Sequence, residues 1–292
     1  MDLSDFAIEP LREDCLDAAA EIFAVSFADG FRAVFPRGPT KDMVRFLRGE
    51  LARAMARADT EEPSAMYPHA KDCRGGMRGK IRAFVARHRP TGQLAGFYVN
   101  ELYENGRAAR HGPVPPSERF PEGGDELLFD TFHQTSAASM RKFFGDESFA
   151  YYEFAAVSPA FRSSGVRAAL SHYSQLTLLY EWNDPPAYNE ALPLAKKLWA
   201  RNGFKLLADN DINALTDKIR ADRGELPPRG TSGDRLVVHP MRRDISMVKT
   251  FEKNGGVRTA MACLVPRAVD DVWTRSETES SHTHAAVQQA KL

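Results

Sequence analysis

The feature that most constrains this chain is the run YYEFAAVSPAFRSSGVRAAL at residues 151–170. Its first half is rich in aromatic and branched residues, as a buried strand is, and Ser158-Pro159 ends it. Arg162-Ser-Ser-Gly165 follows, and the apolar residues then fall at helical spacing. A helix that starts after such a turn binds anions, because its first N–H groups lack internal acceptors and its dipole favours negative charge there. The run therefore predicts a site for a phosphorylated ligand.

Composition restricts the classes of protein to consider. The 292 residues carry 39 basic and 39 acidic side chains, so no overall field favours nucleic acid or an anionic membrane, and nucleic acid is an unexpected partner. The three cysteines lie far apart without metal-ligand spacing and are typical of free thiols in a reducing compartment. The chain shows neither a signal peptide nor a run of about eighteen apolar residues. These features predict a cytoplasmic protein without a membrane partner or a metal.

The periodicities predict a mixed α/β sheet. The expected elements are strands at 7–11, 81–88, 93–102 and 150–157, helices at 40–59, within 127–144, from 165 and at 190–202, and a strand after Gly203. Residues 176–182 either continue a helix or form a further strand.

Three divisions of the chain follow from these signals. Residues 1–207 are predicted to form the core, with an insertion at about 104–147 that selects substrate or acts as a lid. Residues 208–275 are expected to be a C-terminal extension that packs on the core or completes it. The Ser/Thr/Gln/His-rich segment 276–292 is predicted to be a disordered tail.

Two motifs carry a resemblance to a known family. The run V-S-P-x-F-R-x-x-G-V at residues 157–166 resembles the acetyl-CoA-binding segment of GCN5-related N-acetyltransferases, the GNAT superfamily. In that family a central strand leads to R/Q-x-x-G-x-G/A at the start of a helix. The later A-x-x-L-W-x-x-N-G-F, at residues 195–204, is similar to the family's A-x-x-L-Y-x-x-x-G-F. The resemblance implies the GNAT fold, a mostly antiparallel twisted central sheet flanked by helices, and acetyl-CoA as acyl donor.

The resemblance also implies which residues hold the donor. The turn and the head of the helix would hold its pyrophosphate through Arg162, Ser163, Ser164, Gly165, Val166, Arg167 and Ala168. Further donor contacts are implied for Ala156, Val157, Asn189 and Trp199. Arg167 departs from the pattern, because the family has a small residue at that position. Trp199 departs too, since it replaces a tyrosine that often protonates the departing thiolate, and simple packing is its alternative role.

The resemblance implies that Glu153 is the base, acting directly or through water, that deprotonates an ammonium substrate. Strand alternation places Tyr151, Glu153, Ala155 and Val157 on one face, where burial among apolar groups would raise the pKa of the carboxyl. A salt-bridged surface glutamate is the alternative. Tyr188 is the candidate acid, with Tyr180 or water as alternatives. A further alternative is that no acid is needed, because a thiolate is already a fair leaving group. The resemblance also implies that Phe27 and Phe31 line the acceptor pocket, although packing alone explains them too. Glu101, on the preceding strand, is either a rival base or a residue that binds the cationic acceptor.

These observations predict an N-acetyltransferase that moves an acetyl group from acetyl-CoA directly to a primary amine of a small molecule. Two alternatives stay open: a catalytically inactive GNAT-like module that binds CoA or a partner, and an acetyltransferase that acts on a protein or on aminoacyl-tRNA. A homodimer formed through the C-terminal extension also stays open.

Overall fold

A computed structural model of the chain describes residues 5–57, 81–104, 118–180, 182, 184–225 and 234–244. Three of the predicted segments lie partly or wholly outside these residues. They are the insertion, at 105–117, the C-terminal extension, at 226–233 and 245–275, and the whole tail, 276–292. None of the described helices is long and apolar enough to cross a membrane.

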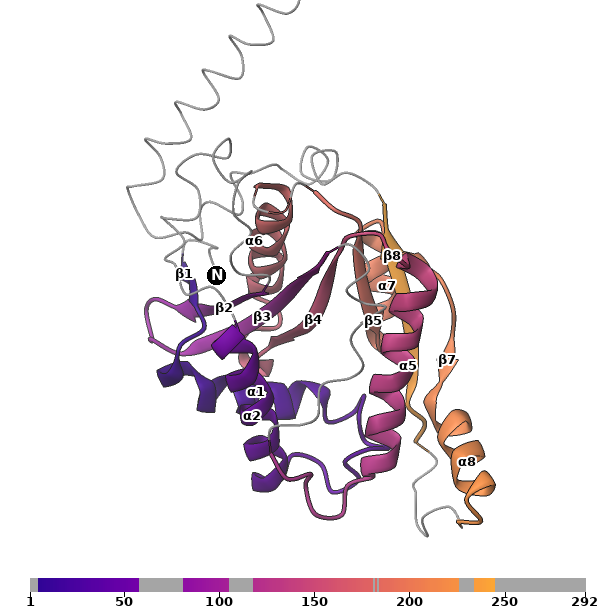
Figure 1. Cartoon of the computed structure of the whole chain (residues 1–292). Helices are drawn as coiled ribbons and strands as arrows, with labels where there is room; N and C mark the ends of the chain where they lie inside the picture. The colour runs from indigo at the N-terminus through magenta and orange to yellow at the C-terminus, as the bar shows by residue number, and fades with distance from the viewer. Residues whose placement is uncertain are drawn as a thin grey trace, which may run out of the picture.

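One mixed sheet forms the centre of the molecule (Figure 1). Its strands run in the order β1-β2-β3-β4-β5-β8-β6, with β7 paired to β8. Among the described strands, the β4–β5 pair alone is parallel, and the other neighbours are antiparallel. The strands are β1 (Phe6–Pro10), β2 (Ile81–His88), β3 (Leu94–Tyr103), β4 (Phe149–Val157), β5 (Ala187–Ala191), β6 (Lys205–Leu206), β7 (Asn210–Asp211) and β8 (Val237–Arg243). The predicted mixed α/β fold with a mostly antiparallel sheet is confirmed.

Helices cover both faces of this sheet. They are α1 (Leu16–Phe27), α2 (Lys41–Arg57), α5 (Glu126–Phe144), α6 (Val166–Tyr180), α7 (Pro193–Arg201) and α8 (Ile212–Asp222). Apolar side chains of α1, α2 and α5 form one core with the sheet, and those of α6 and α7 form a second core on the opposite face. Figure 1 shows α1 and α2 together on one side of the strands and α6 on the other.

The segment around residue 190 corrects the sequence prediction. A single helix was expected at 190–202, but Ala187–Ala191 forms β5 and α7 begins only at Pro193. Proline suits the first position of a helix, where its missing N–H is not needed, and it keeps the preceding residue extended. Leu192 is indeed extended, with φ −67° and ψ 157°. The ambiguous residues from 176 onward continue α6 to Tyr180.

A β-bulge in β4 changes which side chains share a face. Val99 of β3 pairs with Phe154, whereas the next residue, Asn100, pairs with Tyr152, so Glu153 is an extra residue in β4. Beyond the bulge the alternation is therefore reversed. Phe154 packs with the α1 core, while Ala155 and Val157 pack with the α6 core. The predicted sharing of one face by Tyr151, Glu153, Ala155 and Val157 is wrong for this reason.

Strands β4 and β5, both fully described, separate at the same level. They pair only through Ala150 with Ala187 and Tyr151 with Tyr188. The rest of β4 stays hydrogen-bonded to β3 but has no partner on its other side within β5. The sheet is thus open between the carboxyl-terminal halves of its two parallel strands.

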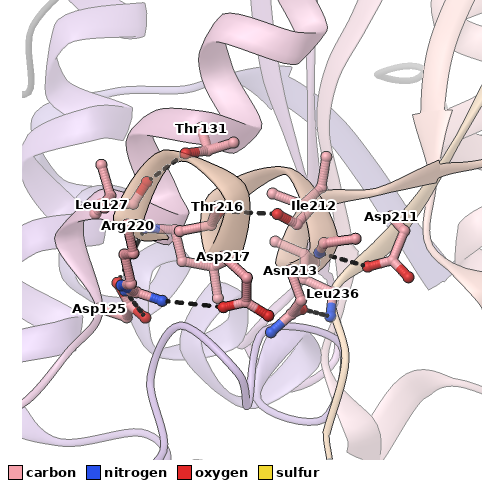
Figure 2. Close-up of polar contacts among 12 residues, drawn as sticks. Asp125, Leu127, Thr131, Asp211, Ile212, Asn213, Thr216, Asp217, Arg220 and Leu236 are labelled. Carbon is pink, nitrogen blue, oxygen red and sulfur yellow. Dashed lines mark hydrogen bonds and ion pairs between the residues drawn. The ribbon is translucent and has the colours of Figure 1, made fainter. Parts of the chain in front are cut away.

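Helix α8 fixes the start of α5 (Figure 2). The Arg220 guanidinium donates to both carboxylate oxygens of Asp125 at 2.6 Å, and both side chains are almost buried. Asp125 also caps α5 by accepting a hydrogen bond from the Leu128 N–H at 3.0 Å. One carboxylate therefore holds two helices together, and α5 in turn supplies part of the wall of the site described below.

The close approach of β3, β4 and α6 at Gly96 gives a test of this packing. A Cβ at Gly96 would lie 2.7 Å from the carbonyl oxygen of Ala156 and 3.0 Å from Leu170 Cδ1. We expect Gly96→Ala to lower the free energy of unfolding by about 1–3 kcal/mol, because the backbone carbonyl cannot move aside cheaply. Urea unfolding measures this change. Adding Leu170→Ala should not restore stability, since it relieves only the side-chain contact; an unchanged midpoint for Gly96→Ala would contradict the packing.

Candidate active site

The turn between β4 and α6 has the geometry of an anion site. After Val157 the chain makes a short 3-10 turn at Pro159–Phe161, and Gly165 then adopts φ +85°, a conformation that favours glycine. Val166 is buried and anchors the helix, whereas Arg162, Ser163, Gly165 and Arg167 are exposed. The head of α6 therefore faces open space.

The donor-binding residues predicted around this turn lie together. Ser163, Ser164 and Gly165 form the turn, and Val166, Arg167 and Ala168 form the first turn of α6. The Val166 N–H reaches the Ser164 hydroxyl at a long 3.4 Å. The exposed guanidinium groups of Arg162 and Arg167 flank the helix head and add positive charge to it.

Asn189 lies on β5 beside the opening between the strands. Its side chain is 2% exposed, and neither its amide nitrogen nor its amide oxygen has a hydrogen-bond partner in the described part of the chain. A buried amide without partners is costly, and such groups in proteins are normally satisfied by a ligand or water when the protein supplies nothing. Across the opening, Ala156 and Val157 form the end of β4, and the Val157 carbonyl accepts a hydrogen bond from the Ser26 hydroxyl at 3.1 Å.

A cavity of about 310 Å³ lies on the α1, α2 and α5 face of the sheet. Phe27 and Phe31, the predicted acceptor-binding residues, both line it. Their ring centroids are 5.7 Å apart, and Phe31 meets Phe132 of α5 edge-on at 5.6 Å. The wall is thus largely aromatic, with further rings from Phe23, Phe35, Phe129 and Phe154.

Carboxylates from three neighbouring strands reach the same cavity. Glu101 of β3 is 2% exposed, Glu153 stands at the bulge of β4, and Glu190 comes from β5. The structure therefore brings the predicted residues Glu101 and Glu153 together with a third carboxylate that the sequence analysis missed. Glu190 was missed because its segment was expected to be helical. The sequence AYNEA does not alternate, and the available signal was Pro193, because a proline keeps the residue before it extended and places the start of the helix after residue 192.

Two tyrosines hold Glu190. The Tyr151 hydroxyl donates to Glu190 Oε2 at 3.1 Å, and the Tyr188 hydroxyl donates to Oε1 at 3.0 Å. Burial raises the pKa of Glu190, and the hydrogen bonds from both tyrosines oppose that rise. Burial also raises the pKa of Tyr151 and of Tyr188 well above the usual range, so both hydroxyls stay protonated donors.

Tyr188 and Trp199 occupy supporting positions. Tyr188 is fully buried against Phe144 and Phe149, and it meets the cavity through Glu190 rather than by lining it. The Trp199 ring packs at 5.3 Å from the ring of Tyr152 and at 5.0 Å from that of Phe204. Packing, the alternative role considered for Trp199, is therefore visible, and its contact with a donor stays a prediction.

The far wall of the cavity carries little net charge. Glu50 and Arg53 of α2 form an ion pair. Burial lowers the pKa of His133 to about 4, with a smaller effect from the charge of Arg53, so the imidazole is neutral at pH 7. Its ring packs on Phe129 at 4.4 Å. Over the described ranges, no three His, Cys, Asp or Glu side chains are grouped so as to hold a metal ion.

An antiparallel sheet opened between two parallel central strands, with a glycine-led helix at the opening, is the GNAT fold. Comparison with solved structures agrees. The chain is similar to a mosquito arylalkylamine N-acetyltransferase-like protein 5b, at 14% identity and a TM-score of 0.51, over 82% of this chain and 99% of that one. It is also similar to the C-terminal condensation domain of Ebony in complex with β-alanyl-dopamine. Here the identity is 15% and the TM-score 0.50, over 81% of this chain and 98% of that one.

A third similar structure is a putative arylalkylamine N-acetyltransferase 7 from the yellow fever mosquito Aedes aegypti, at 12% identity and a TM-score of 0.50, over 81% of this chain and 86% of that one. No protein-family model and no curated protein matches the sequence. The chain has the GNAT fold that its two motifs predict.

The raised pKa of Glu190 gives a prediction for stability. In the folded protein Glu190 keeps its proton to higher pH than in the unfolded chain, so it lowers stability as pH rises above about 4.5, the ordinary value. Glu190→Gln should remove this loss. From pH 4.5 to pH 7, the free energy of unfolding should therefore fall less in the variant than in the wild type. Urea unfolding between these pH values measures it, with the exposed Glu21→Gln as control. A pH dependence equal to that of the wild type would contradict the burial of this carboxyl.

Proposed function

We propose that this chain is an acyl-CoA-dependent N-acyltransferase that acts on the primary amine of a small molecule. The observation that carries the proposal is the coincidence of three features at one level of the sheet. Glu153 bulges out of β4, the pairing of β4 with β5 ends after Tyr151 and Tyr188, and the strand leads into a helix headed by Gly165. Acetyl-CoA is the donor that the resemblance implies.

The residues present fit a CoA thioester. The Ser164 N–H donates to the Phe161 carbonyl at 3.1 Å, but the other amides of the Ser163–Ala168 segment and the guanidinium groups of Arg162 and Arg167 suit a pyrophosphate. The unpartnered side-chain amide of Asn189 suits the amide groups of a pantetheine arm lying between the strands. When bound, the thioester supplies an activated acyl group.

The cavity suits a cationic acceptor with an apolar body. Glu101, Glu153 and Glu190 concentrate negative charge at the sheet, and aromatic rings form the remaining walls. The names of the similar structures support the same class, since one is called arylalkylamine N-acetyltransferase-like, one is called a putative arylalkylamine N-acetyltransferase, and one is in complex with β-alanyl-dopamine. We therefore expect an amine attached to an aromatic or other apolar group.

Glu153 is assigned as the base. An ammonium group must lose a proton before its nitrogen can attack the thioester, and a carboxylate at the bulge stands where the sheet opens. Glu190 lies in the same cavity, and its raised pKa makes it a second proton acceptor. Tyr188 is assigned to holding Glu190, because its hydroxyl donates to that carboxylate. The thiolate then leaves as nitrogen forms its bond to the acyl carbon, and a thiolate needs no dedicated acid to leave.

A binding module without turnover is the second candidate. Two residues favour it: the indole N–H of Trp199 is too weakly acidic to protonate a thiolate, and Arg167 replaces the small residue of the family pattern. A cytoplasmic location, a homodimer and action on a protein or aminoacyl-tRNA stay predictions of the sequence analysis.

Turnover separates these functions. With acetyl-CoA and a panel of primary amines, we expect release of free CoA thiol to be fastest for arylalkylamines. Glu153→Gln should lower kcat/KM by about 100-fold or more, as loss of a positioned base does, while Glu21→Gln should leave it unchanged. Melting temperature with and without acetyl-CoA provides the binding control. Stabilisation by acetyl-CoA without thiol release from any amine would support the binding module instead.

A further inference from the structure

Arg243, the last residue of β8, is a buried cation that the proposed mechanism does not use. Its side chain is 1% exposed, and none of its three guanidinium nitrogens pairs with a carboxylate or makes a well-aligned hydrogen bond among the residues described; the neutral Tyr152 hydroxyl is the polar group beside it. The guanidinium carbon, Cζ, lies 5.2 Å from the ring centroid of Phe204. A cation over a ring recovers only part of the cost of leaving water, so a buried guanidinium without an anion needs an explanation.

The position of Arg243 relates it to the opening of the sheet. It pairs with Ala187 of β5, and the next residue of β5, Tyr188, forms the last pair with β4. Ala187 packs in the core on the α6 and α7 face, together with Tyr152 and Phe204. Arg243 therefore stands beside the point where β4 and β5 separate, on the face opposite the acidic cavity.

Tyr152 connects Arg243 with the cavity. It follows Tyr151, the last residue of β4 that pairs with β5, and it is among the residues that line the cavity. Its ring centroid is 5.8 Å from that of Phe204, the ring over which Arg243 also lies. Burial raises the pKa of Tyr152 and the charge of Arg243 opposes that rise, so the two side chains interact. A group that reaches Tyr152 from the opening therefore approaches Arg243 as well.

The two faces of the sheet differ in charge at this level. Glu101, Glu153 and Glu190 lie on one face, where the amine is expected, and Arg243 lies on the other. An acetyl group would leave Arg243 without an anion. A carboxylate at the far end of a short acyl chain would offer two oxygens to the guanidinium and an acceptor to the Tyr152 hydroxyl.

We propose that Arg243 binds the terminal carboxylate of the acyl group, so that the preferred donor is the CoA thioester of a short dicarboxylic acid. This inference rests on the proposed function and names its donor class. The chemistry of transfer is unchanged: the amine nitrogen bonds to the thioester carbon, the C–S bond breaks, and the proton of the ammonium passes to a carboxylate.

The test compares succinyl-CoA and malonyl-CoA with acetyl-CoA as donors to one amine. The wild type should have a kcat/KM about tenfold or more higher with a carboxylate-bearing donor than with acetyl-CoA. A factor of this size corresponds to the stabilisation that one hydrogen bond between charged groups provides. Arg243→Gln should lose that preference and keep its rate with acetyl-CoA within about threefold. Arg201→Gln, which removes an exposed positive charge, is the matched control.

A second readout does not depend on turnover. Without amine, the dicarboxylic donors should raise the melting temperature of the wild type more than acetyl-CoA does, and Arg243→Gln should abolish the difference. The comparison of donors with the wild type alone tests the proposal even where Arg243→Gln does not fold.

Three outcomes would overturn the inference. The wild type could use acetyl-CoA as well as the dicarboxylic donors. Arg243→Gln could slow all donors equally, which would assign Arg243 to the leaving group through Tyr152. Asp184→Asn could destabilise the protein as Arg243→Gln does, which would identify Asp184, whose charge acts on Tyr152, as an internal partner. Absence of thiol release from every donor would instead contradict the proposed function.

Discussion

The bulge at Glu153 is the constraint on which the rest of the site depends. One extra residue in β4 rotates the strand, and the pairing with β5 ends within two residues of it. The same residue presents its carboxylate to the cavity, and it reverses the faces of the residues that follow. The opening between β4 and β5 and the carboxylate that we propose as the base therefore lie at the same irregularity in a hydrogen-bonded ladder.

Charge is distributed around that opening by element. The head of α6 supplies amides and exposed arginines, three strands supply glutamates to one face, and β8 supplies a buried guanidinium to the other. The aromatic walls come from α1 and the segment after it, from α5 and from Phe154 of β4, and α5 is fixed at its start by the Asp125–Arg220 ion pair. We infer that a segment far along the chain, α8, thus supports the acceptor cavity through one carboxylate.

Local patterns in the sequence predicted the hairpin of β2 and β3, the strand β4 and the glycine-led start of α6, because alternation and turn residues act over short distances. They did not predict β5, since five residues before a proline give a weak periodic signal, nor the bulge, which depends on the pairing of β4 with β3. Glu190 and Arg243 could not be found as site residues for the same reason. Each is placed by a residue distant in sequence: Tyr151 donates a hydrogen bond to Glu190, and Arg243 lies over the ring of Phe204.

We propose that the head of α6 and the opening beside it bind coenzyme A. Isothermal titration of the protein with coenzyme A measures this binding. We expect saturable binding at one site, weakened at least about tenfold by Gly165→Val in a protein that still folds, because a branched residue at φ +85° would displace the turn. The absence of binding heat with the wild type, or equal affinity in the variant, would contradict it.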